Sequence, residues 1–244
     1  MKIFFVFFSF SILISCANYK PLTGGNIDMY PPRFIYSIPN NFSTYVQISL
    51  KEIKIFFDEN IILDNIYDHN HIIMNPFYIR KYVIIHPVNF PKKYISIRFI
   101  KSLKKNTTYS IQFNNCIKDN KEGNVLYFFK YIFSTGKNIN TTHIKGNIKN
   151  FLEFKNKKNT IIGLYEYNET NKYNIEKKPD FIAFIDYKSN KYQILHIKKG
   201  KYLLFCFYDE NGNQIYEPNN KELIFFRKTL FLLEDKEYHI QISK

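Results

Sequence analysis

The chain has 244 residues, which is enough for two domains of about 100 residues, each with its own core. Hydrophobic residues make up 45% of the sequence, with 25 Phe and 20 Tyr but only 8 Gly, so the composition excludes a disordered chain and a glycine-based repeat and favours half-buried β-strands. The net charge of +14 would suit a polyanion, but the lysines are scattered, Arg is scarce and no nucleic-acid-binding motif is present, so we expect compositional bias and no nucleic-acid partner.

The amino terminus has the pattern of a secretory signal peptide. One positive charge precedes an apolar run over residues 3–14. A membrane-spanning helix needs about 20 apolar residues, so the run has the length of a signal-peptide core instead. The run ends in a short motif that resembles the lipobox of bacterial lipoprotein signal peptides: Leu13, Ile14, Ser15 and Cys16.

The lipobox resemblance implies that residues 1–15 are removed and that Cys16 becomes the lipidated first residue. Two or three acyl chains hold a protein firmly on a bilayer, whereas one chain is marginal. Residues 16–28 contain Pro and Gly without a periodic pattern and are expected to form a lipidated tether. In lipoproteins of Gram-negative bacteria, an Asp directly after the lipidated cysteine is a retention signal for the inner membrane. No Asp follows Cys16 directly, so the resemblance implies that the protein lies on the outer membrane, on either its periplasmic side or its surface.

A first β-rich domain is predicted at residues 29–136. Runs of β-branched and aromatic residues alternate there with turn residues at spacings of about 10 to 15, which is typical of an antiparallel sandwich. A short strand is expected between Pro32 and Ser37. The longer predicted strands cover 46–57, 81–86, 94–100, 107–113 and 125–133.

Several short motifs in this first domain resemble a bacterial Ig-like domain of the S-layer type. They occur in the order that the family shows, and the resemblance implies a non-catalytic module. Asn106, Gly123 and the polar residues around them are turn formers, so these motifs define the geometry of turns. The resemblance therefore assigns no functional residue to this chain. The motifs lie at Pro31-Pro32, 37–40, 57–59, 103–109, 117–124 and 133–136.

A second β-sandwich is predicted at residues 142–244. The residues around Gly200, where a glycine turn leads into an apolar run, resemble carboxypeptidase-regulatory or transthyretin-like modules, which are seven-stranded sandwiches. The predicted fold class is therefore all-β, with two antiparallel sandwiches after a signal peptide. The predicted strands of the second domain cover 143–148, 160–165, 180–186, 192–197, 203–209, 230–232 and 237–242.

Two cysteines, Cys116 and Cys206, follow the lipobox cysteine. The extracytoplasmic compartment would permit a disulfide between them. Each lies in a different predicted domain, however, and Cys206 lies inside an apolar strand pattern. We therefore expect a buried free thiol at Cys206.

The turn after the strand at 203–209 is a candidate calcium loop. Its oxygen-bearing side chains have the spacing of a calcium loop, although the glycine is at the fourth position and no Glu is at the twelfth. A plain hairpin turn around Asn211 and Gly212 explains the same residues. The candidate calcium ligands are Asp209, Asn211, Asn213 and Glu217.

Two other groups could carry chemistry. Asp68, His69 and His71, with His86 later, could hold zinc or copper, but no further ligand is fixed by spacing, so no metal site and no cofactor are assigned. Asp58 and Glu59 are paired carboxylates, although a glycosidase needs its carboxylates at a set distance across a cleft.

These observations predict a non-catalytic, lipid-anchored protein of the cell envelope. It would bind an envelope protein or a glycan through a strand edge or a loop end. One alternative is an enzyme acting on glycans or peptidoglycan, although the sequence has no hydrolase or phosphate-binding motif. A second alternative is a calcium-dependent adhesin.

Overall fold

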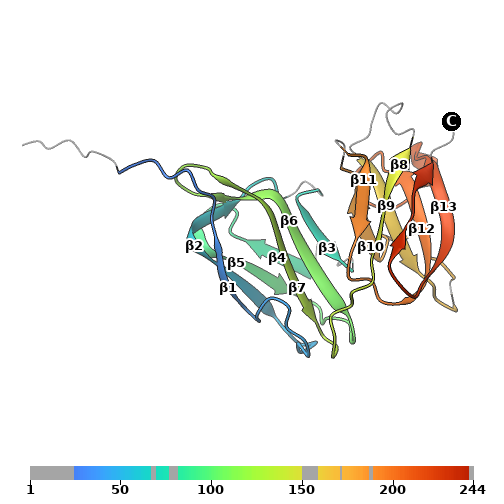
Figure 1. The fold of residues 1–244 in the computed structure, drawn as a ribbon, viewed down its shortest axis with the longest axis horizontal. Coiled ribbons are helices and arrows are strands. Elements are labelled where there is room, and N and C mark those ends of the chain that lie inside the picture. The colour runs from blue at the N-terminus through green and yellow to red at the C-terminus, as the bar shows by residue number, and fades with distance from the viewer. Residues whose placement is uncertain are drawn as a thin grey trace, which may run out of the picture.

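The computed structural model describes residues 25–66, 70–76, 82–149, 159–170, 172–186 and 189–241. These residues form β-strands and no α-helix, and the short 3₁₀ helix η4 lies at Pro218–Asn220, so the predicted all-β fold class is confirmed. A helix able to cross a bilayer does not occur among them. Figure 1 shows two bodies side by side, with β1–β7 in the N-terminal half and the later strands in the C-terminal half.

Seven strands of the N-terminal half form one hydrogen-bonded sheet that folds over into two layers. The sheet has the order β3-β6-β2-β5-β4, while β1 pairs with β2 and β7 pairs with β6. All these pairings are antiparallel. The strands are β1 (Phe34–Ile38), β2 (Glu52–Leu63), β3 (Ile72–Asn75), β4 (Val83–His86), β5 (Lys92–Phe99), β6 (Thr108–Asp119) and β7 (Val125–Ser134).

Strand β2 joins the two layers because it changes partner along its length. Its first part pairs with β5, and its register with β5 jumps between Phe56 and Ile61, where the strand turns to β6. The strand predicted at 46–57 is therefore wrong at both ends, because β2 begins at Glu52 and continues through residues 58–60 to Leu63. The reason is a local anchor, because Arg33 donates from its backbone N–H and from Nε to the Asp58 carboxylate, both at 2.8 Å.

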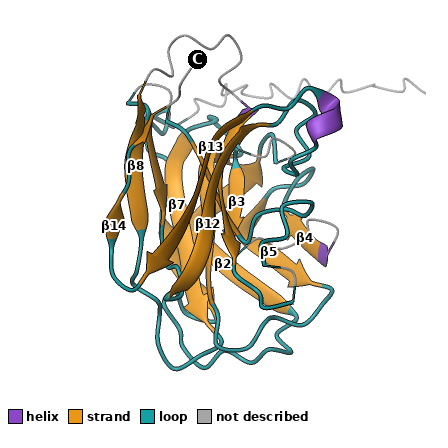
Figure 2. Ribbon diagram, turned by 90° about the vertical axis from the view of Figure 1, so that its right-hand side faces the viewer, coloured by secondary structure: helices purple, strands orange, loops and turns teal. Residues whose placement is uncertain are grey.

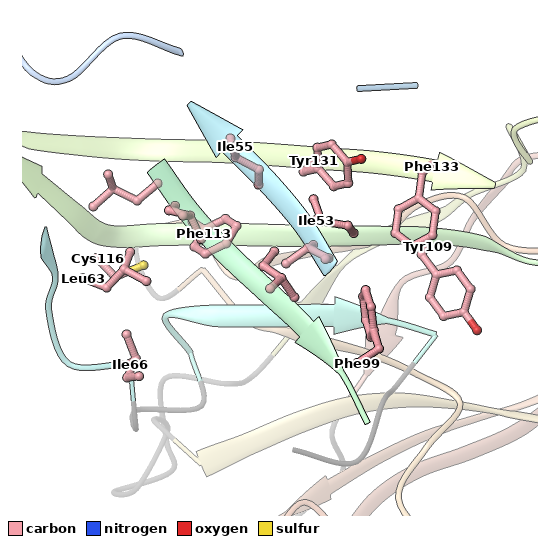
Figure 3. Packing of buried hydrophobic residues seen from close by; sticks show 14 of the residues in the cluster. Ile53, Ile55, Leu63, Ile66, Phe99, Tyr109, Phe113, Cys116, Tyr131 and Phe133 are labelled. Atoms are coloured by element: carbon pink, nitrogen blue, oxygen red, sulfur yellow. The ribbon is translucent and has the colours of Figure 1, made fainter. Parts of the chain in front are cut away.

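The core of the N-terminal half follows from strand alternation. In β2 the buried positions Ile53, Ile55 and Phe57 alternate with partly exposed ones, which is the pattern of a strand with one face on the core. Figure 3 shows such side chains meeting between the layers, with Phe113 and Tyr131 pointing into the same space.

The C-terminal half consists of two four-stranded sheets. One has the order β10-β9-β12-β13, and the other contains β11, β8 and β14, with β15 also paired to β8. The pairings of β14 and β15 with β8 are parallel, which the sequence did not indicate. The strands are β8 (Ile144–Lys149), β9 (Thr160–Glu166), β10 (Phe181–Phe184), β11 (Lys191–Ile194), β12 (Gly200–Tyr208), β13 (Ile224–Leu232), β14 (Lys236–Glu237) and β15 (Ile240–Gln241).

Strand β12 is the most deeply buried strand of the C-terminal half. Its residues from Tyr202 to Phe207 are buried on both faces, because one face packs between the two sheets and the other packs on a smaller cluster around Tyr165. Figure 2 shows β12 and β13 side by side in front of the N-terminal strands. Cys116 and Cys206 are both buried and free, as expected for Cys206, and burial raises the pKa of the Cys116 thiol to about 12.

Candidate functional site

The two halves meet where the edge strand β10 approaches β3. The Asn75 side chain forms there the two hydrogen bonds that a neighbouring strand would form with Ile182. Its Nδ2 donates to the Ile182 carbonyl and its Oδ1 accepts the Ile182 N–H, both at 2.9 Å. Asn75 is 7% exposed and Ile182 is 3% exposed. Since buried backbone groups must be paired, this side chain satisfies an edge that would otherwise lack partners.

Further contacts flank this pair. Ile73 packs against the smaller cluster of the C-terminal half, and Lys104 lies 3.8 Å from the Asp180 carboxylate. In the connection between the halves, the Asn140 N–H donates to Thr108 Oγ1 at 2.8 Å. The junction thus combines apolar burial, one ion pair and directed hydrogen bonds.

Beside this junction lies a cleft of about 510 Å³, within the range of ligand sites. Its first wall is the outer face of β3, β6 and β7. Residues of β6 alternate, so Ser110 and Gln112 face the cleft while their neighbours face the core. Strand register places Ile73, Gln112 and Lys130 in one row across the three strands.

The second wall of the cleft comes from the C-terminal half, mainly from β8, β10 and β11. In β11 the buried Tyr192 and Ile194 alternate with exposed residues, and Gln193 lies opposite Lys145 of β8 in the register. The side of the cleft formed by this wall includes Lys145, Phe184, Lys191, Gln193, Leu195 and Glu237.

Positive charge in the cleft is not neutralised by ion pairs. Within the described ranges, no carboxylate lies within ion-pair distance of Lys130, Lys145 or Lys191. Burial lowers the pKa of the partly buried Lys130. An ammonium group that has lost part of its water and has no counter-charge favours an anion.

The two carboxylates that line the cleft already have partners. Asp186 accepts the hydroxyl hydrogen of Ser189 at 2.6 Å. Glu237 lies 3.8 Å from His239 Nε2. The described lining therefore carries three lysines and two carboxylates, so its net charge is positive.

The loop after β12 brings the four predicted calcium ligands together. Asp209 accepts the backbone N–H groups of Asn213 at 3.2 Å and of Gln214 at 2.8 Å. Glu217 Oε2 accepts the Nδ2 groups of Asn211 at 2.8 Å and of Asn213 at 2.7 Å, and these bonds lower the pKa of Glu217. The carboxylates thus receive N–H donors from their own loop, and calcium binding stays a prediction.

The same loop holds a carboxylate that the sequence did not single out. Glu222 is 5% exposed and accepts the Glu217 N–H at 2.6 Å. Burial is the main cause that raises its pKa, and the charge of Asp209 adds to the effect. Glu222 therefore ties the far end of the loop to its middle.

Of the candidate metal ligands around Asp68, the structure describes only His71 and His86. His71 contacts the Asn65 carbonyl at 3.1 Å, and His86 lies at the end of β4, while Asp68 and His69 fall outside the described residues. The described part of the chain has no group of three or more His, Cys, Asp or Glu placed to hold a metal ion.

Asp58 and Glu59 differ in environment. Asp58 is bound by Arg33. Burial raises the pKa of Glu59, helped by the nearby charge of Asp119. Neither lines the cleft, so the pair lacks the position that a glycosidase would need.

The lipobox residues Leu13, Ile14 and Ser15 and the lipidation site Cys16 lie outside the described residues. The cleft residues, in contrast, are well placed but were not predicted. In the sequence these residues are marked only as the polar positions that alternate with apolar ones along a strand. That pattern does not indicate which outer sheet faces of the two halves lie against each other.

Comparison with known proteins supports the first domain. The family model of the bacterial Ig-like domain matches residues 28–135, which confirms the resemblance that the motifs predicted there. No curated protein matches the chain. The resemblance of the second half to carboxypeptidase-regulatory-like modules and the boundaries of both domains stay predictions.

Among solved structures, the N-terminal part of the bacterial S-layer protein SbsC is 8% identical, with a TM-score of 0.28 over 83% of this chain and 44% of that chain. The major pilin subunit BcpA of Bacillus cereus is 9% identical, with a TM-score of 0.28 over 87% of this chain and 70% of that chain. The chain thus spans less than half of the S-layer fragment. TM-scores of this size do not define a shared overall fold.

Proposed function

We propose that this protein is a non-catalytic binding protein of the bacterial cell envelope, held on a membrane through acyl chains on Cys16. The observation that carries the binding role is the cleft between the halves, which gathers unneutralised lysines and hydrogen-bonding groups on strands. Groups mounted on strands of packed sheets keep a fixed geometry, which lowers the entropic cost of binding.

The envelope location rests on two independent features. The sequence places a lipobox-like motif ending in Cys16 directly after an apolar run, and residues 28–135 match a bacterial Ig-like domain. A lipid anchor followed by the tether at 16–28 would present the cleft at the membrane surface. We propose the outer membrane, on either of its sides.

One alternative is an enzyme that acts on envelope glycans. Such an enzyme needs an acid and a second carboxylate facing the substrate, whereas Asp186 and Glu237 are bonded to neighbouring side chains. Hydrolysis of isolated envelope polymers by the purified protein would support this alternative over a binding role.

The other alternative is a calcium-dependent adhesin. The loop that gathers Asp209, Asn211, Asn213 and Glu217 favours it by position, although its carboxylates accept N–H groups. Since a ligand that binds only the folded state must stabilise it, a calcium-dependent rise in melting temperature that Asp209→Ala abolishes would support the adhesin.

The binding role can be tested in cells with a photo-crosslinking amino acid. We expect benzoylphenylalanine in place of Phe128, which lines the cleft and is 53% exposed, to give a light-dependent adduct with an envelope component. The matched control replaces Tyr45, which is 68% exposed and does not line the cleft. Equal adducts from both positions, or none from position 128, would contradict binding in the cleft.

A further inference from the structure

The open edge of β11 indicates what the cleft binds. Asn190 O accepts the Ile148 N–H on the β8 side, whereas Lys191 O accepts the Asp186 N–H from the opposite side, both at 2.9 Å. Because backbone groups alternate along a strand, the N–H and C=O groups of Gln193 also point away from β8, and so does the N–H of Leu195, which directly follows the strand.

Apart from the β-bridge between Asp186 and Lys191, no partner covers this edge in the described part of the chain. Strand β11 ends its sheet, and no backbone group outside that sheet bonds to Gln193 or Leu195. Both residues line the cleft. An unpaired strand edge is a template for another extended chain, and here the unpaired groups lie at residues 193–195, because the Lys191 carbonyl already accepts the Asp186 N–H.

Three lysines and the two carboxylates Asp186 and Glu237 line the cleft beside this edge, so the net charge there is positive and favours an acidic partner. Lys191 lies on β11 itself, Lys145 lies opposite Gln193 on β8, and Lys130 faces them from β7. None of the three has an ion pair among the described residues. Carboxylates placed at alternate positions of an added strand would supply the missing counter-charges.

We propose that the cleft binds an extended acidic segment of another polypeptide, which adds a strand to the open edge of β11 and places its carboxylates beside Lys130, Lys145 and Lys191. This proposal rests on the binding role proposed above and specifies its ligand. A peptide fits better than an acidic glycan because only a peptide repeats N–H and C=O groups at strand spacing.

The test is calorimetric titration of the full-length chain with a short synthetic peptide in which glutamate alternates with threonine. Its glutamine-for-glutamate analogue should bind at least about tenfold more weakly, since one charge-assisted hydrogen bond accounts for about that ratio. Lys130→Gln should weaken binding of the glutamate peptide by about tenfold. The control Lys51→Gln, at an exposed position that does not line the cleft, should leave binding unchanged.

A second variant separates strand addition from charge attraction. Gln193→Pro removes an N–H that points away from β8, so the sheet keeps its own bonds while the edge loses its donor. We expect this variant to lose peptide binding. In the wild type, peptide binding should slow hydrogen exchange at the Gln193 and Leu195 amides.

Two outcomes would overturn the proposal. Equal binding of the glutamate peptide and its glutamine analogue, or no binding of either, would exclude an acidic peptide. Binding of polygalacturonate, a carboxylated glycan, equally by the wild type and Gln193→Pro without binding of the peptide would also overturn it. That last result would leave the proposed binding role intact.

Discussion

At the scale of single residues, Asp119 shows how one side chain fixes a turn. Its carboxylate accepts the backbone N–H groups of the next turn at 2.7 to 3.0 Å, and Asp119 is 2% exposed. Asp119→Ala would leave these donors without their acceptor, so we expect a loss of about 2 kcal/mol in the free energy of unfolding, measured by urea denaturation. A change below about 0.5 kcal/mol, the scale of a neutral surface substitution, would show that water replaces the carboxylate. The N–H groups belong to Lys121, Glu122, Gly123 and Asn124.

The same carboxylate makes stability depend on pH. Burial by itself raises the pKa of Asp119, but the backbone N–H bonds outweigh it and the pKa is lowered. The folded state therefore holds the proton less tightly than the unfolded chain, in which an Asp has a pKa of about 3.9. The contribution is present above that value and is lost as pH falls through the folded pKa. We expect the stability difference between wild type and Asp119→Ala to shrink below about pH 4; a difference that is constant with pH would contradict this reading.

Part of this turn could be predicted from the sequence. Gly123 and Asn106 were both predicted to be turn formers, and both adopt a positive φ, of 81° and 46° respectively. The role of Asp119 could not be read in the same way. An aspartate before a turn is common, and only the fold shows that its carboxylate points inward to the backbone.

At the scale of elements, β8 depends on a glycine. Gly146 lies where β8 receives the final segment of the chain, and a Cβ there would overlap the Tyr238 backbone carbonyl. We expect Gly146→Ala to destabilise the protein by about 3 kcal/mol, because packed backbone cannot move aside cheaply. Gly25→Ala is the control, since nothing lies within 4 Å of a Cβ at Gly25. Equal stability of the two variants would show that the final segment does not pack on β8.

Strand prediction succeeded where alternation was long and regular. The strands predicted at 94–100 and 107–113, which alternate in sequence, correspond to β5 and to the first half of β6. Strand β3 was missed because it is only four residues long, between segments without a periodic pattern. The parallel pairing of β14 and β15 with β8 could not be predicted, since short strands carry no signal for their partner or direction.

At the scale of the whole molecule, Asn75 is expected to hold the halves together. Asn75→Ala leaves the buried N–H and C=O of Ile182 without partners, so we expect about 2 to 4 kcal/mol of destabilisation. Loss of this contact should also widen the distance distribution measured by small-angle X-ray scattering. The exposed Thr229→Ala is the control. Unchanged scattering in a destabilised Asn75→Ala would mean that the halves stay in place through their other contacts.

The two sheet-rich halves were predictable, whereas the cleft between them was not. Composition and strand spacing indicated all-β structure, and ordered turn motifs indicated the Ig-like domain. The cleft depends on which outer faces meet, and that is decided by a few side chains such as Asn75 and Ile73. No periodic pattern distinguishes these polar outer positions from solvent-exposed ones.

The most direct measurement of the central claim, a lipid-anchored envelope protein, is the intact mass of the membrane-extracted chain beside a Cys16→Ser variant. We expect the wild type to begin at Cys16 and to carry acyl mass, and the variant to lack that acyl mass. A wild type that keeps residues 1–15 and carries no lipid would contradict the anchor and the envelope location together.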